Sequence, residues 1–142
     1  IVNNWFGTLL GYDSSVSAGQ DSTGSGGQVL LEGGTTRFVE NHIEPVYTGG
    51  VNLNLAGRRN FVLFNHIGHG GSIGLDMAPA DNSVVSGNLV YWNDAKSTST
   101  NAIRVGSSVD RAVVAANRIG NVSSVSGSGT NNSIGNNEGG TL

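Results

Sequence analysis

Three histidines and two glutamates lie close together in the sequence and could supply acid–base chemistry. His42, His66 and His69 are all the histidines in the 142-residue chain, and Glu40 and Glu44 flank the first of them. Imidazole changes its charge near neutral pH, so a histidine beside a carboxylate can act as a general base. We therefore take His42, His66, Glu40 and Glu44 as candidate catalytic residues.

The same histidines also have a purely structural interpretation. His42 and His66 hold the same place in two copies of a repeated phrase, so repetition alone would stack them on an outer surface. No third orienting group is evident near them, which favours the surface stack over catalysis. Metal binding is a further option, but the chain contains no cysteine to add a thiolate ligand. We predict no metal site and no cofactor.

The repeated phrase reads apolar residue, two variable residues, Asn, one variable residue, apolar residue. Four of its asparagines, at positions 41, 65, 88 and 117, are separated by 24, 23 and 29 residues. A phrase that recurs at such intervals indicates stacked structural units. An Asn amide carries two donors and an acceptor, so it can bond the equivalent Asn of the units above and below. The predicted ladder comprises Asn4, Asn41, Asn65, Asn88, Asn117 and Asn137.

A second apolar segment precedes each asparagine at a nearly constant distance. These segments end at Leu31, Leu55, Met77 and Val105, which lie 10, 10, 11 and 12 residues before the next asparagine of the phrase. No helical period of 3.6 connects the two segments, so we expect a coil of parallel β-strands and exclude a stack of helices. The columns predicted to point inward are Ile1/Phe38/Val62/Val85/Val114/Ile134, Phe6/Ile43/Ile67/Val90/Ile119, Val29/Leu53/Leu75/Ile103 and Leu31/Leu55/Met77/Val105.

Composition suits one domain of this kind and excludes two classes of partner. Twenty-three glycines, two prolines and 12% charged residues fit tight turns between short strands. The net charge is −3 and the basic residues are scattered, so we expect no nucleic-acid partner. No apolar run reaches the roughly 18 to 20 residues of a membrane span, so we expect no membrane insertion. We interpret residues 1–142 as one β-helix domain of a longer chain, with a long insertion at 7–28 and a loosened C-terminal coil and tail at 120–142.

The length of the coils varies at one corner. From the apolar residue that follows each ladder asparagine to the next strand, the steps are 23, 10, 8 and 13 residues. Such insertions often form the binding surface of a repeat protein, although they can also be tolerated excursions. Aromatic faces can pack on sugar rings while amides and carboxylates bond hydroxyls, and the aromatic residues have the alternative of packing on the coil or a neighbouring subunit. The candidate binding residues are Tyr12, Tyr47, His69, Tyr91, Trp92, Asn93 and Asp94.

The phrase, on coils of about two dozen residues from Ile1 to about Asn137, resembles the pectate-lyase-like superfamily. The resemblance implies an all-β fold, namely a right-handed single-stranded parallel β-helix (β-solenoid) of about five to six coils with an Asn ladder. It also implies recognition or cleavage of an extended polysaccharide. The polar coils and the corner at 91–94 look most like a bacteriophage tailspike or capsule depolymerase. That likeness implies a homotrimer at an extracellular or virion surface, with a bacterial surface glycan as partner.

Three functions remain open at this point. The first is polysaccharide recognition and depolymerisation by a tailspike-like β-helix, which would be a glycoside hydrolase or a polysaccharide lyase. The second is a non-enzymatic structural or adhesive shaft whose repeats build length. The third is a secreted polysaccharide lyase or epimerase, although the calcium-binding acidic group beside a catalytic arginine that marks the lyases is not recognisable here. We also expect an ion pair between Asp76 and Arg104, which hold equivalent outward positions on neighbouring strands.

Overall fold

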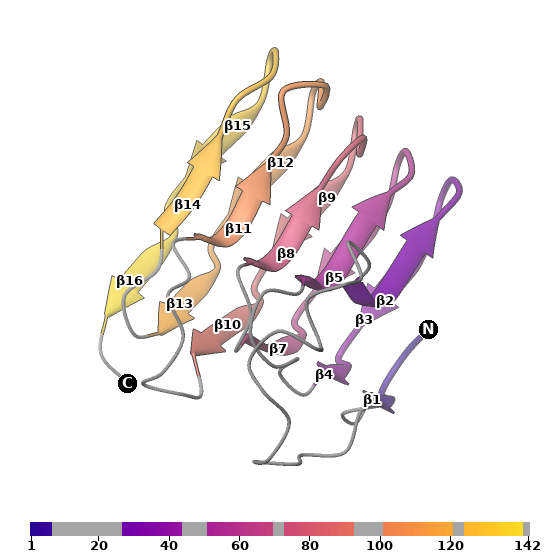
Figure 1. Cartoon of the computed structure of the whole chain (residues 1–142), viewed down its shortest axis with the longest axis vertical. Helices are drawn as coiled ribbons and strands as arrows, with labels where there is room; N and C mark the ends of the chain where they lie inside the picture. The colour runs from indigo at the N-terminus through magenta and orange to yellow at the C-terminus, as the bar shows by residue number, and fades with distance from the viewer. Residues whose placement is uncertain (7–26, 44–50, 70–72, 93–100, 121–123, 141–142) are drawn as a thin grey trace, which may run out of the picture.

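The computed structural model describes residues 1–6, 27–43, 51–69, 73–92, 101–120 and 124–140 (Figure 1). Throughout these ranges the regular elements are β-strands, and every strand pair is parallel. The same ranges hold no helix with the length and hydropathy to cross a bilayer. This confirms the predicted all-β parallel solenoid.

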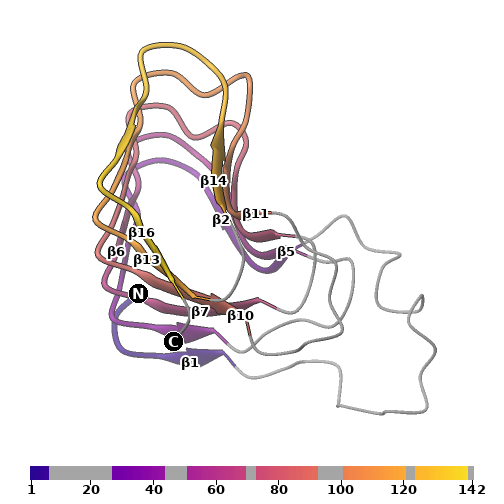
Figure 2. The same ribbon diagram turned by 90° about the vertical axis from the view of Figure 1, so that its left-hand side faces the viewer.

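The strands form three sheets, and each coil adds one strand to each sheet in turn (Figures 1 and 2). Sheet I has the order β1-β4-β7-β10-β13-β16, sheet II the order β14-β11-β8-β5-β2, and sheet III the order β15-β12-β9-β6-β3. Sheet I comprises β1 Trp5–Phe6, β4 His42–Ile43, β7 His66–His69, β10 Leu89–Trp92, β13 Arg118–Gly120 and β16 Glu138–Gly140. Sheet II comprises β2 Gly27–Glu32, β5 Val51–Ala56, β8 Ile73–Met77, β11 Asn101–Val105 and β14 Ser124–Gly127. Sheet III comprises β3 Arg37–Val39, β6 Phe61–Leu63, β9 Val84–Ser86, β12 Val113–Ala115 and β15 Ser133–Gly135.

The C-terminal coil is more regular than the sequence suggested. Strands β14, β15 and β16 continue all three sheets inside the segment 120–142 that we expected to be loosened. At the other end, β2 begins at Gly27, so its first two residues belong to the stretch 7–28 that we assigned to an insertion. Backbone pairing along the stack therefore extends the regular coils beyond the repeated phrase.

The predicted inward columns stack in the expected register and form the core. Phe38 pairs with Val62, which pairs with Val85, and all three side chains are fully buried. Leu53 is likewise buried between its neighbours on β2 and β8. Ile1, in the first coil, is 53% exposed, and Ile134, in the last coil, is 40% exposed, although both were predicted to point inward. Each has a stacked neighbour on only one side, so the core closes around the middle coils.

The asparagine ladder is present along the corner between sheets III and I. The Nδ2 of Asn65 donates to Oδ1 of Asn88 at 2.9 Å, and the backbone N–H of Asn65 donates to the same oxygen at 2.9 Å. Asn88 repeats both bonds to Oδ1 of Asn117, at 2.9 and 3.1 Å. Each amide thus satisfies a turn N–H of the preceding coil, which would otherwise be buried without a partner. The same side-chain contact joins all six predicted residues, from Asn4 through Asn41, Asn65, Asn88 and Asn117 to Asn137.

A second polar ladder, which the sequence analysis missed, lies at the corner between sheets II and III. The N–H of Thr36 donates to Oδ1 of Asn60 at 2.8 Å, and the N–H of Asn60 donates to Oγ of Ser83 at 3.1 Å. Ala112, which has no side-chain acceptor, interrupts this ladder, but its own N–H donates to Oδ1 of Asn132 at 2.9 Å. Before each ladder position at both corners stands a residue with positive φ, which reverses the chain direction in a short turn.

The expected ion pair between Asp76 and Arg104 is bidentate. Nε and Nη2 of Arg104 lie 2.8 and 2.6 Å from the two carboxylate oxygens of Asp76. The Arg104 side chain is 47% exposed, but that of Asp76 is only 7% exposed. The bond to Asp76 raises the pKa of the Arg104 guanidinium. We expected an outward pair on the surface, and the structure instead buries its acidic half.

At the second corner, Asp110 accepts hydrogen bonds that lower the pKa of its carboxyl group. The main cause is Nδ2 of Asn131, which lies 2.9 Å from Oδ1, followed by the hydroxyl of Thr130 at 3.0 Å. Because the folded pKa is lowered, Asp110 stabilises the fold above its unfolded pKa, and this contribution is lost as the pH falls through the folded pKa.

We expect Asn131→Ala to raise the pKa of Asp110 toward its usual value, since the mutation removes the largest of these hydrogen bonds. Thr130→Val should raise it less. NMR titration of the Asp110 carboxyl carbon in both variants measures the two shifts. A larger shift in Thr130→Val than in Asn131→Ala would contradict the assignment.

Candidate functional site: an aromatic stripe on sheet I

The residue directly after each ladder asparagine points outward from sheet I. In the register of the sheet, Trp5 pairs with His42, and His42 pairs with His66. The column then continues through Leu89 to Arg118. Because neighbouring parallel strands lie about 4.8 Å apart, these side chains form a line along the coil axis.

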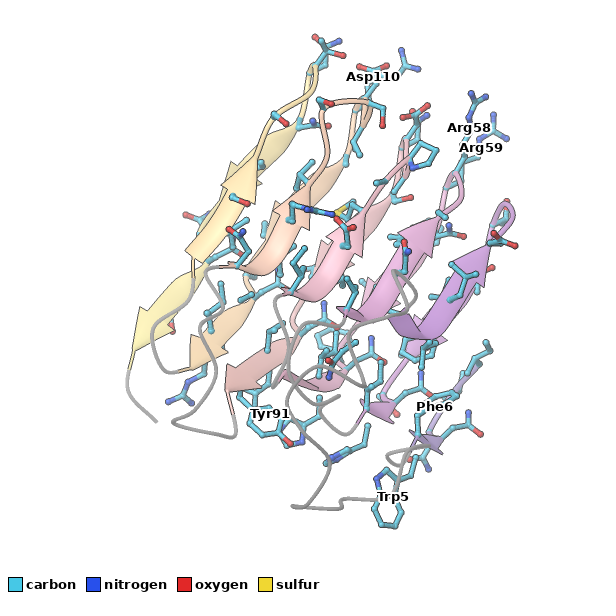
Figure 3. The ribbon with its side chains drawn as sticks, in the orientation of Figure 1. Trp5, Phe6, Arg58, Arg59, Tyr91 and Asp110 are labelled. Atoms are coloured by element: carbon cyan, nitrogen blue, oxygen red, sulfur yellow. The ribbon has the colours of Figure 1, made fainter. Side chains whose placement is uncertain are left out.

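Four ring-bearing side chains contact one another along this line, and we call Trp5, His42, His66 and Tyr91 the aromatic stripe. The ring centroids of Trp5 and His42 are 6.3 Å apart, and those of His42 and His66 are 4.6 Å apart, both edge-on. The ring of Tyr91 lies 4.3 Å from that of His66 at a tilt of 34°. Trp5 and Tyr91, labelled in Figure 3, lie at the two ends of the stripe on the same side of the stack.

Tyr91 reaches His66 because of the residue opposite it. Tyr91 pairs in register with Gly68, whereas His66 pairs with Leu89. Gly68 has no side chain, so the tyrosine ring has room to lean across the neighbouring strand toward His66. Trp5, at the other end of the stripe, is 74% exposed. An exposed indole with an apolar face and an N–H donor is a typical recognition residue.

The predicted catalytic residues are only partly brought together in what the structure describes. His42 and His66 lie side by side in the stripe. Glu40 lies two residues before His42, exposed at the corner with a φ of 55°. Across the described ranges, no hydrogen bond or ion pair holds its carboxylate. Glu44 lies outside the described residues, and its role stays a prediction.

Among the predicted binding residues, Tyr91 takes part in the stripe. His69 and Trp92 pair through their backbones on β7 and β10. Their side chains lie outside the described part of the structure. The remaining four, Tyr12, Tyr47, Asn93 and Asp94, also lie outside it.

The variable corner itself is confirmed by the order of the strands. The segments 7–26, 44–50, 70–72, 93–100 and 121–123 each join a strand of sheet I to a strand of sheet II. The corner between sheets III and I is crossed by two residues in every coil, and the corner between sheets II and III by four to seven, whereas these segments range from three to twenty residues. The stripe therefore lies on the sheet that leads into the variable segments.

Trp5 is the site residue that the sequence analysis missed, although a signal for it was present. It follows Asn4 as His42 follows Asn41 and His66 follows Asn65, so it holds the outward position of the first copy of the phrase. We singled out the histidines because they can titrate. The position of Trp5 directly after a ladder asparagine indicates that its side chain lies in line with those of the histidines.

In the part of the chain that the structure describes, no group of three or more His, Asp and Glu side chains could hold a metal ion. The C-terminal half of the outward column carries charge, with Arg118 paired in register with Glu138, and both residues are exposed. The outer face of sheet I thus offers the stacking surface of the stripe toward the N-terminal coils and hydrogen-bonding charges toward the C-terminal coils.

No protein-family model matches the chain, and neither a curated protein nor a solved structure matches it. What the chain does must therefore be inferred from the coils and from the aromatic stripe.

Proposed function

We propose that this β-helix binds an extended polysaccharide along the aromatic stripe of sheet I. The observation that carries the proposal is the line of four contacting rings, with Trp5 74% exposed at one end. Sugar rings have apolar faces that pack on aromatic side chains, and their hydroxyls take directed hydrogen bonds. A polymer that runs along the coil axis would meet one ring on each of four neighbouring strands.

The polar groups beside the rings suit the same ligand. Imidazole nitrogens and the tyrosine hydroxyl both donate and accept hydrogen bonds, as sugar hydroxyls do. Arg118 and Glu138 add a donor fork and an acceptor farther along the column. The chain thereby offers a repeated surface to a repeated ligand, which fits the tailspike-like role at an extracellular or virion surface that the resemblance implies.

Cleavage of the bound glycan is the second part of the proposal. His66 would donate a proton to the glycosidic oxygen as its bond to the sugar carbon breaks, and Glu40, at the adjacent corner, would accept the proton of the attacking water. His42 lies beside His66 with its Nε2 buried, where it would orient the pair. The alternative is a binding shaft without catalysis. His66→Ala should abolish depolymerisation measured by the release of reducing ends. Full retention of activity in His66→Ala, or no activity in the wild type, would favour the shaft.

We expect Trp5→Ala and Tyr91→Ala each to weaken polysaccharide binding by about tenfold or more, because each removes a stacking ring from the stripe. Isothermal titration with oligosaccharides from bacterial capsule or O-antigen measures the change. Tyr91→Phe should lose less than Tyr91→Ala, since it keeps the ring.

Leu30→Ala is the matched control for these variants. Leu30 is an apolar residue of sheet II and is 51% exposed, so its loss removes exposed surface on another side of the coil. Its affinity should equal that of the wild type. Equal losses in Leu30→Ala and Tyr91→Ala, or wild-type binding by Trp5→Ala and Tyr91→Ala together, would refute the assignment of the stripe.

A further inference from the structure

Sheet III differs from the other two sheets in its outer face. Its inward residues belong to the core, but most of the residues that alternate with them are apolar as well. Phe61, Val84 and Val113 follow one another in register, and Val113 is 39% exposed. We call this surface the sheet III face. It comprises Val39, Phe61, Leu63, Phe64, Val84, Val113 and Ala115, which are half-buried or exposed.

The outer faces of the other sheets are polar by comparison. Sheet II presents Asn54, Asp76 and Arg104 in one column, and sheet I presents its histidines and charged residues. Parallel sheets that helices cover on both faces have strands that are apolar on both sides. The sheet III face has the composition of a covered face.

Phe64 marks the edge of this face at a backbone position that disfavours it. Its φ is 54°, and its side chain is 64% exposed. A Cβ atom added to Gly87 would lie 2.5 Å from Cδ1 of Phe64, so the ring lies flat across the glycine of the next coil. A bulky residue in the left-handed region is unfavourable, whereas Asn3 and Asn136 in the same column are residues that tolerate it. Phe64 thus adds an exposed apolar ring to the face, although its backbone conformation in the turn is unfavourable for a bulky residue.

Turns of four to seven residues lead from sheet II into sheet III, and turns of two residues lead from sheet III into sheet I. Residues 33–36 join β2 to β3, and residues 40–41 join β3 to β4. The two longest connecting segments, 7–26 and 93–100, run from sheet I to sheet II. Among the described residues no segment covers the sheet III face, and we look for its cover in another molecule.

Charge selects the occupant and its orientation. Arg37 lies on the side of the face next to sheet II, and Glu40 lies on the side next to sheet I, both in the same coil and both exposed. The guanidinium of Arg37 also lies 5.8 Å from the centre of the Phe61 ring. The last coil of the face, around Ser133 and Asn136, carries no charged residue, and the nearest charges are Asp110 and Arg111 in the coil before it. A face that places a cation and an anion on opposite sides of one coil is complementary to itself.

We propose that a second copy of this chain binds the sheet III face through a two-fold axis parallel to the coil axis. That rotation keeps coils level and places Arg37 of each copy opposite Glu40 of the other, which gives two ion pairs around an apolar centre. A two-fold axis perpendicular to the coils would instead bring both residues opposite the uncharged end. The proposal does not depend on the polysaccharide site, which lies on sheet I, and it differs from the homotrimer that the tailspike likeness implies.

The size of the face predicts a weak dimer. Five strands at about 4.8 Å and a width of four residues at about 3.3 Å give a surface of ~24 by ~13 Å. Specific stable interfaces bury about 800 Å² per partner, which is more than this surface offers. We therefore expect a dimer that dissociates on dilution.

Sedimentation velocity of the 142-residue chain over a hundredfold range of concentration tests the proposal. The wild type is compared with variants in which the charge of Arg37 or Glu40 is reversed. The wild type should pass from monomer to dimer as concentration rises. Arg37→Glu and Glu40→Arg should each raise the dissociation constant about tenfold, because each places like charges opposite one another. The double variant should return to within about twofold of the wild type. Failure of the double variant to recover, a trimer, or a monomer at every concentration would overturn the proposal.

Phe64→Asn tests the sheet III face with a variant in which weaker association is not expected to result from loss of folding. Asn tolerates the left-handed turn, so this variant should keep or raise the midpoint of thermal unfolding while it weakens association about tenfold. The matched control is Leu30→Asn, which makes an apolar-to-polar change on sheet II and should leave the dissociation constant unchanged. Wild-type association in Phe64→Asn, or equal weakening in Leu30→Asn, would count against the sheet III face.

Discussion

Asn88→Ala is expected to lower the free energy of unfolding by about 3 to 5 kcal/mol, because it removes the centre of the asparagine ladder. Asn88 is 1% exposed, and its Oδ1 accepts bonds from the backbone and the side chain of Asn65. Its Nδ2 donates to Asn117 and to the carbonyl oxygen of Val62. Alanine would leave several of these buried groups without partners, and each such group costs about 1 to 3 kcal/mol.

Asn4→Ala is the matched control, because Asn4 carries out the same role at the exposed end of the ladder. Water can replace its amide there, so we expect a loss below about 1 kcal/mol. Urea denaturation of both variants, with the slopes compared to exclude a change in the unfolded state, gives the two values. Similar losses at Asn4 and Asn88 would mean that the ladder contributes little beyond a preference for Asn in turns.

Arg104→Met should have the largest effect after Asn88→Ala among the variants proposed, with an expected loss of about 2 to 3 kcal/mol in the free energy of unfolding. The variant keeps much of the length of the side chain but leaves the carboxylate of Asp76 buried, with 7% of its side chain exposed, and without its bidentate partner. Removing one partner of a fully buried pair costs about 3 to 5 kcal/mol. The expectation is lower here because the Arg104 side chain is 47% exposed to solvent.

Two comparisons separate this effect from a general loss of charge. Combining Asp76→Asn with Arg104→Met should cost less than the sum of the single variants, since no unpaired carboxylate remains. Arg58→Met should cost less than about 1 kcal/mol, because Arg58 is 76% exposed and lies 3.5 Å from Asp81. Equal losses for Arg58→Met and Arg104→Met in chemical denaturation would show that burial of Asp76 does not matter.

The ladder could be predicted because Asn recurs at each of its positions, and the core because apolar residues recur at each inward position. Six asparagines in one repeated phrase predict the corner between sheets III and I. The alternation of apolar residues around them predicts which side chains point into the core and which point outward. Register followed from the constant distance between the two apolar segments of a coil. Local pattern and tertiary contact agree here because each coil packs mainly on its neighbours.

The second ladder could not be recognised by identity, because Thr36, Asn60, Ser83, Ala112 and Asn132 share only small size. An amide oxygen or a hydroxyl oxygen can accept the hydrogen bond of the backbone N–H at this corner. No single residue type therefore recurs at these positions. A signal existed in spacing alone. Each of these residues stands two positions before an inward apolar residue of sheet III.

The outer faces were the least predictable part of the candidate site. Sequence alternation shows that Asp76, Phe61 and His66 point away from the core, but it does not show what each of them contacts. The burial of Asp76 and the packing of Tyr91 on His66 depend on the coils alongside. The apolar character of the sheet III face appears only when three outer columns are compared in register.

Cross-hydrogen-bond scalar couplings in isotope-labelled protein test the stacked coils most directly. The structure predicts a coupling from the backbone nitrogen of Asn41 to the side-chain carbonyl carbon of Asn65, and equivalent couplings from Asn65 to Asn88 and from Asn88 to Asn117. All three should appear in one spectrum. Their absence while the protein is folded, or couplings from these nitrogens to other residues, would contradict the ladder and the line of rings that it positions.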